Sequence, residues 1–432
     1  MSSYKFSTNF EELARRLADA LKTRDEEMVL ETYEAIARYH SKKELPRKPL
    51  EAIAGLAYSK HQYMLAERAL AHLTGPPAEF AESVSKCPEN CFAAVKLSYL
   101  LTRKLYKPQL AKLYLETALK HLEHSVKPEQ YSEYANLFPL EDPLAAARNE
   151  REYISKLYEY RSPPDNPTDD LQTVALFGMQ TLSSYRLAED LAKRTGVHKY
   201  EFSRRINTRT GLILRSISGN DNAKVVSQML DELDMPSFVV ADKLVDALVP
   251  ESRPVKQLGV RDEGIYMQMN YRDNVTIPWD DVVLFDGCKL RHTEQKKEKP
   301  RRIRKYHYGG PGVSAGIIPQ TPKTKIVESQ LDYITVVSKN PFVLNVFNAH
   351  EGAILKKLTY DGEYRGPKSK PEWFAETVIQ KCNPIVGYGG HQLAYDGFAG
   401  DWRNLTYKSA DEYLDHLAWL FLVNKYPDNG NS

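Results

Sequence analysis

The chain of 432 residues is longer than one ordinary hydrophobic core supports, and its 42% of hydrophobic residues can fill several cores, so we expect two or three domains. The 59 Lys and Arg residues nearly balance 57 Asp and Glu residues, and the formal net charge of +2 excludes a global attraction to nucleic acid or to an anionic membrane. Any electrostatic function must therefore be local.

The sequence shows no signal for export or for a membrane span. Residues 1–25 are charged and have helical periodicity without an apolar signal segment, and no apolar stretch of about 18 residues occurs anywhere. The cysteines are too few and too scattered for a disulfide scaffold or a four-thiolate zinc site. We therefore expect a cytoplasmic protein that makes no membrane contact.

Residues 1–162 are expected to form a helical domain. Of the 22 glycines only Gly55 and Gly75 precede residue 178, and apolar residues recur at every third or fourth position. Residues 162–170, SPPDNPTDD, contain three prolines that stop a helix, which indicates a linker at this point.

A short segment recurs within this helical part. The sequence AERALAHL at 66–73 is echoed by LETALKHL at 115–122, with a small alanine at the same place in both copies. With the Gly, Tyr and Ala residues of GLAYSKHQYMLAERA at 55–69, it resembles a tetratricopeptide-like α-solenoid, although one residue is missing between the Tyr and the first Ala and the family's Trp is absent. The resemblance covers about a third of the chain and implies a concave face that binds peptide or protein. A plain helical domain that supports its neighbour is the alternative.

Residues 168–290 are expected to form a helical hairpin and an α+β domain. Two or three helices are predicted over residues 171–211, where the periodicity is helical. A strand at 211–218, a helix at 220–236 and a strand from Ser237 then form a β-α-β unit. Further strands are predicted at 263–270, 274–279 and 281–290.

Residues 291–325 are expected to form a basic linker or loop that contains Gly and Pro, and residues 326–432 a C-terminal α+β segment that ends in helices. In this last segment, strands are predicted within 332–348 and 353–360 and helices at 372–382 and 410–426, with Gly387, Gly389 and Gly390 in a loop between the two helices. The expected fold is multidomain: helical and solenoid-like first, then mixed α+β domains with antiparallel strands.

Residues 191–207, LAKRTGVHKYEFSRRIN, resemble a helix-turn-helix. Gly196 suits the left-handed turn between the two helices, and Phe202 would anchor the second helix. Residues 186–215 carry eight Lys or Arg against three Asp or Glu, which suits phosphate contact. Arg205, however, stands where the motif has an apolar residue, and a hairpin packed on the β-α-β unit is the alternative.

The most biased stretch is residues 289–306, with nine Lys or Arg against two Glu. Like charges at this density repel and few apolar residues are present, so a solvated loop is one interpretation and a basic arm that neutralises phosphates is the other. The candidate residues for nucleic-acid contact are Lys193, Arg194, Lys199, Arg204, Arg205, Arg301, Arg302, Arg304 and Lys305.

Signals for catalysis, a cofactor or a metal are poor. The GVSAG sequence around Ser314 lacks the strand before it and the helix after it that a nucleophile elbow requires. His121 and His124 lie on neighbouring turns of a helix without a further ligand at matching spacing, and Cys87 and Cys91 have no second pair nearby. We therefore expect no catalytic, cofactor or metal site.

Two hypotheses about function remain open. The first is a non-enzymatic cytoplasmic scaffold that binds protein partners through a helical repeat-like domain and an α+β docking body. The second is a nucleic-acid-binding protein that uses the basic hairpin at 186–215 and the basic segment at 289–306.

Overall fold

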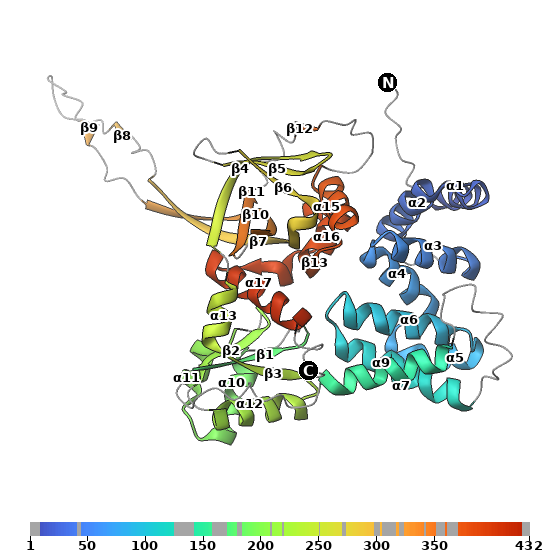
Figure 1. Ribbon diagram of the computed structural model, residues 1–432, viewed down its shortest axis with the longest axis horizontal. Coiled ribbons are helices and arrows are strands. Elements are labelled where there is room, and N and C mark those ends of the chain that lie inside the picture. Colours follow the sequence, from blue (N-terminus) through green and yellow to red (C-terminus); the bar gives the residue numbers. More distant parts are fainter. Residues whose placement is uncertain are drawn as a thin grey trace, which may run out of the picture.

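The computed structural model of the 432-residue chain has two parts, a helical body at residues 9–157 and an α+β body at residues 171–425 (Figure 1). This order confirms the expected sequence of an α part and an α+β part. The residues that the structure describes are 9–40, 45–124, 142–157, 171–178, 184–207, 210–217, 220–249, 251–269, 274–297, 303–304, 317–318, 324–340, 343–350, 359–360 and 370–425.

The helical body consists of helices that pack mainly on their neighbours in the chain. Within it α1 packs on α2, α3 on α4 and α6 on α7, and further contacts join α2 to α3 and α4 to α6. The helices are α1 (Phe10–Thr23), α2 (Glu26–Tyr39), α3 (Arg47–Ser59), α4 (Tyr63–Thr74), α5 (Pro77–Lys86), α6 (Asn90–Arg103), α7 (Pro108–His124) and α9 (Pro143–Leu157).

Helix α6 is the centre of this body. Of its 14 residues, 11 are buried, and the other three are Lys96, Tyr99 and Arg103. The repeated segments lie in α4 and α7, and both of these helices pack on α6. The matching alanines Ala69 and Ala118 are 0% exposed, because a side chain no larger than a methyl group lets the helices approach closely.

The α+β body begins with a small sheet of strand order β2-β1-β3, in which β1 is antiparallel to both neighbours. Its strands are β1 (Gln172–Leu176), β2 (Leu212–Ile217) and β3 (Ser237–Ala241), and its helices are α10 (Ser184–Thr195), α11 (Lys199–Arg205), α12 (Asn220–Glu232) and α13 (Asp242–Leu248). The expected strand, helix and strand of the β-α-β unit are β2, α12 and β3.

The prediction of helix over the whole of residues 171–211 is wrong, because this range begins with β1. Successive side chains of β1 point alternately into two different cores. Val174 and Leu176 pack with α10 and α12, whereas Ala175 and Phe177 face the core on the opposite side of the sheet. Because β1 is buried on both faces, its sequence QTVAL has no alternation of apolar and polar residues that would reveal a period of two.

The large sheet has strand order β13-β7-β10-β11-β4-β5-β6, with β12 beside β4 and β14 beside β7. Its strands are β4 (Glu251–Arg261), β5 (Gly264–Met269), β6 (Asn274–Pro278), β7 (Val282–Lys297), β10 (Thr324–Asn340), β11 (Val343–His350), β12 (Thr359–Tyr360), β13 (Ile385–Val386) and β14 (Thr406–Tyr407). A separate pair is formed by β8 (Ile303–Arg304) and β9 (Ile317–Ile318).

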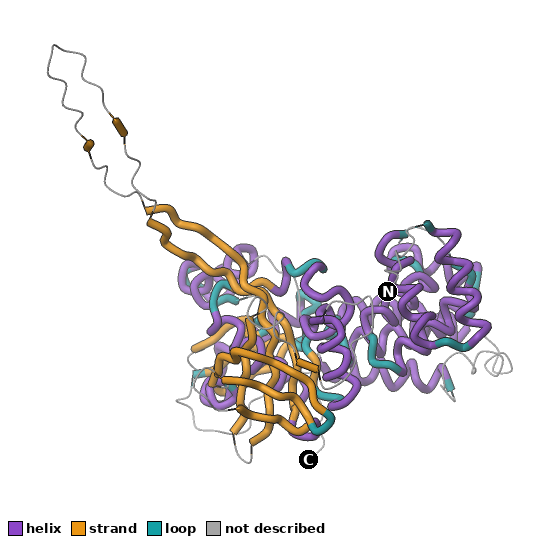
Figure 2. Tube along the Cα trace, turned by 90° about the horizontal axis from the view of Figure 1, so that it is seen from above, coloured by secondary structure: helices purple, strands orange, loops and turns teal. Residues whose placement is uncertain are grey.

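The longest ladder joins β7 to β10, and its far end extends as a two-stranded ribbon beyond the rest of the sheet (Figure 2). The expected strands at 263–290 and within 332–348 are confirmed. The large sheet combines strands from both sides of the boundary expected between residues 290 and 326, since β4 to β7 pair with β10 to β14 in it.

Three helices complete the α+β body: α15 (Lys370–Cys382), α16 (Tyr388–Asp396) and α17 (Ala410–Lys425). Short 3-10 turns occur at η1 (Trp279–Asp281), η2 (Gly397–Ala399) and η3 (Arg403–Leu405). Helix α17 lies between the two sheets and contributes to a core that both of them share (Figure 1). Among the described residues no helix combines the length and the apolar character that crossing a membrane requires.

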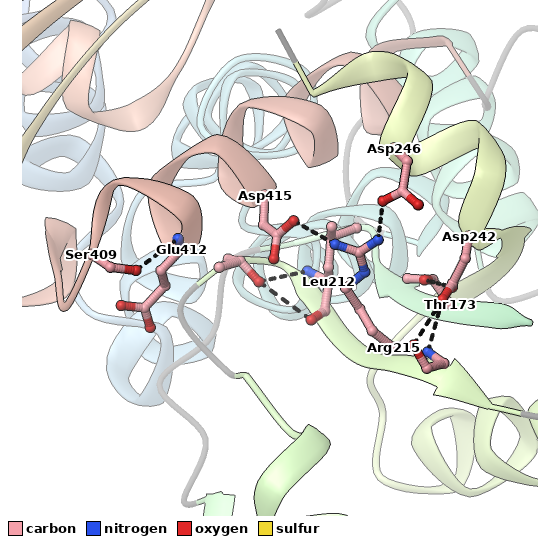
Figure 3. A network of polar contacts seen from close by, with 10 residues as sticks. Thr173, Leu212, Arg215, Asp242, Asp246, Ser409, Glu412 and Asp415 are labelled. Atoms are coloured by element: carbon pink, nitrogen blue, oxygen red, sulfur yellow. Dashed lines mark hydrogen bonds and ion pairs between the residues drawn. The ribbon is translucent and has the colours of Figure 1, made fainter. Parts of the chain in front are cut away.

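Polar contacts attach the small sheet to α17 (Figure 3). The guanidinium of Arg215 on β2 donates to Asp415 on α17 at 2.8 Å and pairs with Asp246 on α13. Nearby, the carboxylate of Asp242 accepts hydrogen bonds from the Thr173 hydroxyl and from the backbone N–H of Ser216. These contacts connect β1, β2, α13 and α17 within one network.

Two glycines with left-handed backbone provide a matched test of this packing. Gly196 and Gly211 have φ of +70° and +77°, but a Cβ at Gly196 meets nothing within 4 Å whereas a Cβ at Gly211 overlaps the indole of Trp419. We expect Gly196→Ala to lower the free energy of unfolding by about 1 kcal/mol, from backbone strain alone. Gly211→Ala should cost about 1–3 kcal/mol more, because it overpacks the core. Denaturant unfolding measures both variants, and equal losses would contradict the described position of Trp419.

Candidate functional site

The N-terminus of helix α16 packs directly against strand β7. Gly387 is its N-cap, and the backbone N–H of Gly390 donates to Oδ1 of Asp286 at 2.9 Å. The prediction that Gly389 and Gly390 lie in a loop is therefore wrong, because a helix starts here and its N-terminus binds an anion of the protein itself. A Cβ at Gly389 would overlap the carbonyl oxygen of Gly287, so this glycine permits the close approach of α16 to β7.

The second carboxylate oxygen of Asp286 faces α17. It accepts a hydrogen bond from the Tyr413 hydroxyl at 3.3 Å and lies 3.5 Å from Nε2 of His416. Asp286 and His416 are 0% exposed. Burial raises the pKa of the neighbouring Cys288 well above its ordinary value, so this thiol stays protonated and is a poor nucleophile.

Helix α16 also packs against the helical body. Its residue Tyr395 belongs to the core of that body. The ring centres of His391 and of Tyr63 on α4 lie 5.1 Å apart. Arg38 on α2 pairs with Asp396 at 2.8 Å. The position of α16 therefore determines how the helical body is attached to the large sheet.

A narrow pocket of about 10 Å³, room for about one water molecule, lies at this interface. The Tyr395 hydroxyl belongs to its lining and, although the residue is only 5% exposed, has no hydrogen-bond partner among the described residues. The Gln62 side chain donates to Glu376 at 2.8 Å, and Nδ1 of His61 lies 2.8 Å from the Tyr63 hydroxyl. The lining residues are Glu34, His61, Gln62, Tyr63, Met64, Leu65, Glu376, His391, Ala394 and Tyr395.

Beside the pocket, Lys96, Tyr99 and Arg103 form what we call the α6 stripe. Spacings of three and four residues place them on one face of the helix. The ammonium of Lys96 lies 5.3 Å from the ring centre of Tyr58, and the guanidinium of Arg103 lies 3.0 Å from that of Tyr153. Tyr99 is 40% exposed, whereas Lys96 and Arg103 are half-buried, so the stripe presents an aromatic ring to solvent between two half-buried cations.

The next residue, Lys104, connects the stripe with the pocket. Its ammonium lies 5.5 Å from the ring centre of Tyr63. Burial lowers the pKa of Lys96 and of Lys104, and Arg103 lowers that of Lys104 further. Positive charge in this region is therefore disfavoured in the free protein.

The pocket histidines respond to the same environment. Burial and then Lys104 lower the pKa of His61, and burial, Lys104 and His61 lower the pKa of His391 to about 3. His391 is therefore neutral at physiological pH. On the other side of the stripe, burial raises the pKa of Glu150 to about 7 against the attraction of Arg103, so this carboxyl carries only part of a negative charge near neutral pH.

The predicted basic hairpin consists of α10 and α11, joined at Gly196 in a left-handed conformation. Phe202 is buried at 9% exposure, and four residues later Ile206 is buried and bridges to Leu214 of β2. Phe202 and Ile206 therefore attach the hairpin to the small sheet.

Three of the five predicted hairpin cations contact acidic side chains or a backbone carbonyl of the protein. Arg194 pairs with Glu232 on α12, Lys193 lies 3.9 Å from Asp190, and Arg205 donates to the carbonyl oxygen of Ser216 at 3.3 Å.

The other two cations lie over exposed tyrosines. Lys199 lies 3.2 Å from the ring centre of Tyr185, and Arg204 lies 5.7 Å from that of Tyr200. These two tyrosines are 62% and 59% exposed. The hairpin therefore combines cations with accessible aromatic rings.

The second predicted basic segment lies elsewhere. Arg304 is in β8, which Figure 1 shows far from α10 and α11, beyond the end of the β7–β10 ladder. Arg301, Arg302 and Lys305 lie outside the described residues, as does Ser314. The strand that carries Arg304 therefore does not lie beside the hairpin.

Other candidate residues have ordinary surroundings. His121 and His124 lie at the end of α7, and the described residues contain no group of three His, Cys, Asp or Glu side chains that could hold a metal ion. The cysteines are free thiols, of which Cys91 is buried and Cys87 half-buried.

Neither Asp286 nor the α6 stripe was among the predicted site residues, although each has a local signal in the sequence. Asp286 is the one acidic residue within the largely apolar strand segment VVLFDGCKL. The stripe residues are spaced as one face of an otherwise apolar helix, CFAAVKLSYLLTR.

In comparisons with protein-family models, with curated proteins and with solved structures, no match to this chain was found.

The Asp286 contacts lead to a stability prediction. Asp286→Ala removes the acceptor of the Gly390 N–H and the Tyr413 hydroxyl inside the core, and we expect it to lower the free energy of unfolding by about 3 kcal/mol or more. Asp286→Asn keeps one acceptor oxygen and should lose less. Exposed Asp401 provides the control, since Asp401→Ala should leave the unfolding midpoint unchanged. Equal midpoints for all three variants would contradict the role of Asp286.

Proposed function

We propose that this chain is a non-enzymatic cytoplasmic scaffold whose helical body binds a protein partner on the α6 stripe. The observation that carries the proposal is the stripe itself: α6 is buried except at Lys96, Tyr99 and Arg103, and these three residues gather two cations and an exposed aromatic ring at one place. Tyr and Arg side chains are enriched at protein interfaces, where they contribute large contact areas and charge-assisted hydrogen bonds.

In this proposal the helical body is a solenoid-like array of the tetratricopeptide type. The successive packing of α1 on α2, α3 on α4 and α6 on α7 supports this, as do the buried alanines at matching places in α4 and α7. The α+β body provides a second docking surface. Val225 on α12, Leu233 directly after α12 and Leu244 on α13 are each at least 40% accessible.

Site-directed photo-crosslinking tests the proposal. A benzophenone amino acid placed at Tyr99 in the full chain should capture a protein in nuclease-treated native lysate, and the same probe at Leu113 on α7, which is 55% exposed, should not capture it. The captured band should disappear when Lys96 and Arg103 are replaced by Glu. Identical bands from positions 99 and 113, or no band from position 99, would count against the proposal.

Nucleic-acid binding is the alternative function, and the hairpin of α10 and α11 favours it specifically. Exposed Tyr185 and Tyr200 beside Lys199 and Arg204 combine stacking surfaces with phosphate contacts, as in proteins that bind single strands. Under this alternative the α+β body is the binding part, and protein partners are secondary.

A variant with four substitutions tests whether the basic segment contributes to nucleic-acid binding. Because we propose protein partners, we expect the change of Arg301, Arg302, Arg304 and Lys305 to Ser to leave both retention on a nucleic-acid column and melting temperature unchanged. The double variant Tyr185→Ala and Tyr200→Ala is measured beside it. A large loss of retention in either variant at unchanged melting temperature would favour the nucleic-acid function.

A further inference from the structure

We infer that helix α9 is a pH-sensitive lid over α6 and α7, closed while Glu150 carries a proton and loosened when this side chain ionises. The inference goes beyond the proposed function, because it concerns an equilibrium of the chain itself and involves no partner. Helix α9 packs on α7 and on α6. Its opening uncovers the faces of both helices that lie beneath it.

The first argument is the position of Glu150 on α9. The buried residues of this helix are spaced alternately by four and three positions, which places them on one stripe. Ala147 and Ile154 belong to the core of the helical body, and Leu157 belongs to the core that the two sheets share. Glu150 lies at the middle of the stripe and is 4% exposed. A carboxyl group therefore occupies the place where an apolar side chain would hold α9 at any pH.

The second argument is that the protein satisfies this carboxyl only in part. Among the described residues Oε1 of Glu150 has no hydrogen-bond partner, and neither has Nε of Arg103. Oε2 of Glu150 lies 3.5 Å from that Nε, which is longer than a charge-assisted hydrogen bond. The centre of the guanidinium instead lies 3.0 Å from the ring centre of Tyr153. Ionisation of Glu150 in the closed state therefore costs free energy that its protonated form avoids.

The groups around Glu150 on α6 and α3 do not offset this cost. Burial raises the pKa of Glu150 to about 7, and it outweighs the Arg103 guanidinium and the Thr102 hydroxyl, which lower this pKa. The phenols of Tyr99 on α6 and Tyr58 on α3 lie nearby. Burial raises the pKa of Tyr58, so this phenol stays neutral.

The groups of α7 do not balance the carboxyl either. Burial lowers the pKa of His121, so its ring is neutral at pH 7. Glu123 pairs with Arg148 on α9 at 3.2 Å, so these two charges offset each other. Among the described residues, Arg103 is therefore the charged group that acts on the pKa of Glu150.

The direction of the pH dependence follows from this pKa. When α9 opens, water surrounds Glu150 and its pKa returns toward the ordinary value of 4.5. The closed state therefore binds the proton more tightly, and low pH favours closure. This advantage is complete below about pH 4.5 and is lost as the pH rises through about 7, above which both states are ionised. Between pH 5 and pH 8 the ratio of closed to open chains should fall on the order of fifty-fold.

Hydrogen exchange of the full chain, followed by mass spectrometry, tests the inference. After correction for intrinsic exchange rates, the protection of residues 143–157 should fall on the order of fifty-fold from pH 5 to pH 8. The protection of α1, which packs on α2, should not fall with it. In Glu150→Gln, whose side chain is neutral at both pH values, the protection of residues 143–157 should stay constant.

Two further variants identify the carboxyl that is responsible. Glu152→Gln removes an exposed carboxyl of the same helix, which pairs with Lys156, and should leave the fall in protection unchanged. Arg103→Gln removes the cation that lowers the pKa of Glu150, so the fall should move to higher pH. Circular dichroism melting at pH 5 establishes that each variant is folded.

A fall that persists in Glu150→Gln, or that is absent from the unmodified chain, would overturn the inference. An equal loss of protection in α1 and α9 would also overturn it, because the carboxyl would then govern the stability of the whole helical body rather than a lid. None of these measurements involves a partner, so the proposed function is decided separately by capture at position 99.

Discussion

The architecture depends on one buried carboxylate. Asp286 lies within β7 without access to water, so its carboxyl oxygens need hydrogen-bond partners from the protein itself. The N-terminus of α16 supplies one partner and α17 supplies the others, which brings three elements together at one point. Because α16 in turn contacts the helical body, the same carboxylate also determines how the two bodies are joined and where the pocket between them lies.

Local features of the fold were predictable from the sequence, and long-range pairing was not. The helical period of the first part, the turn at Gly196 and the strand character of residues 263–290 all depend on neighbouring residues, and all three are confirmed. Strand β1 was not predicted, because its five residues are all buried and precede a helix. The order of the large sheet joins β13 and β14 to β7 across about 100 intervening residues, and no local pattern specifies such partners.

The candidate site shows the same division. The α6 stripe follows from residue spacing on one helix, and its signal was available in the sequence. The pocket was not accessible in this way, because His61 and His391 lie on separate bodies and meet only once α16 is in place. The basic hairpin was located correctly as two helices with a turn, but the sequence did not reveal that Arg194 pairs with Glu232 on a neighbouring helix.

The participation of Tyr395 in the core of the helical body has a consequence for biosynthesis. The ribosome releases α1 to α9 long before α16, so these helices emerge while part of their core is still missing. Closing that core requires a contact over hundreds of residues, whose loop entropy slows the final step. The nascent helical body therefore exposes apolar surface until α16 has been synthesised, and chaperones bind such exposed apolar surface.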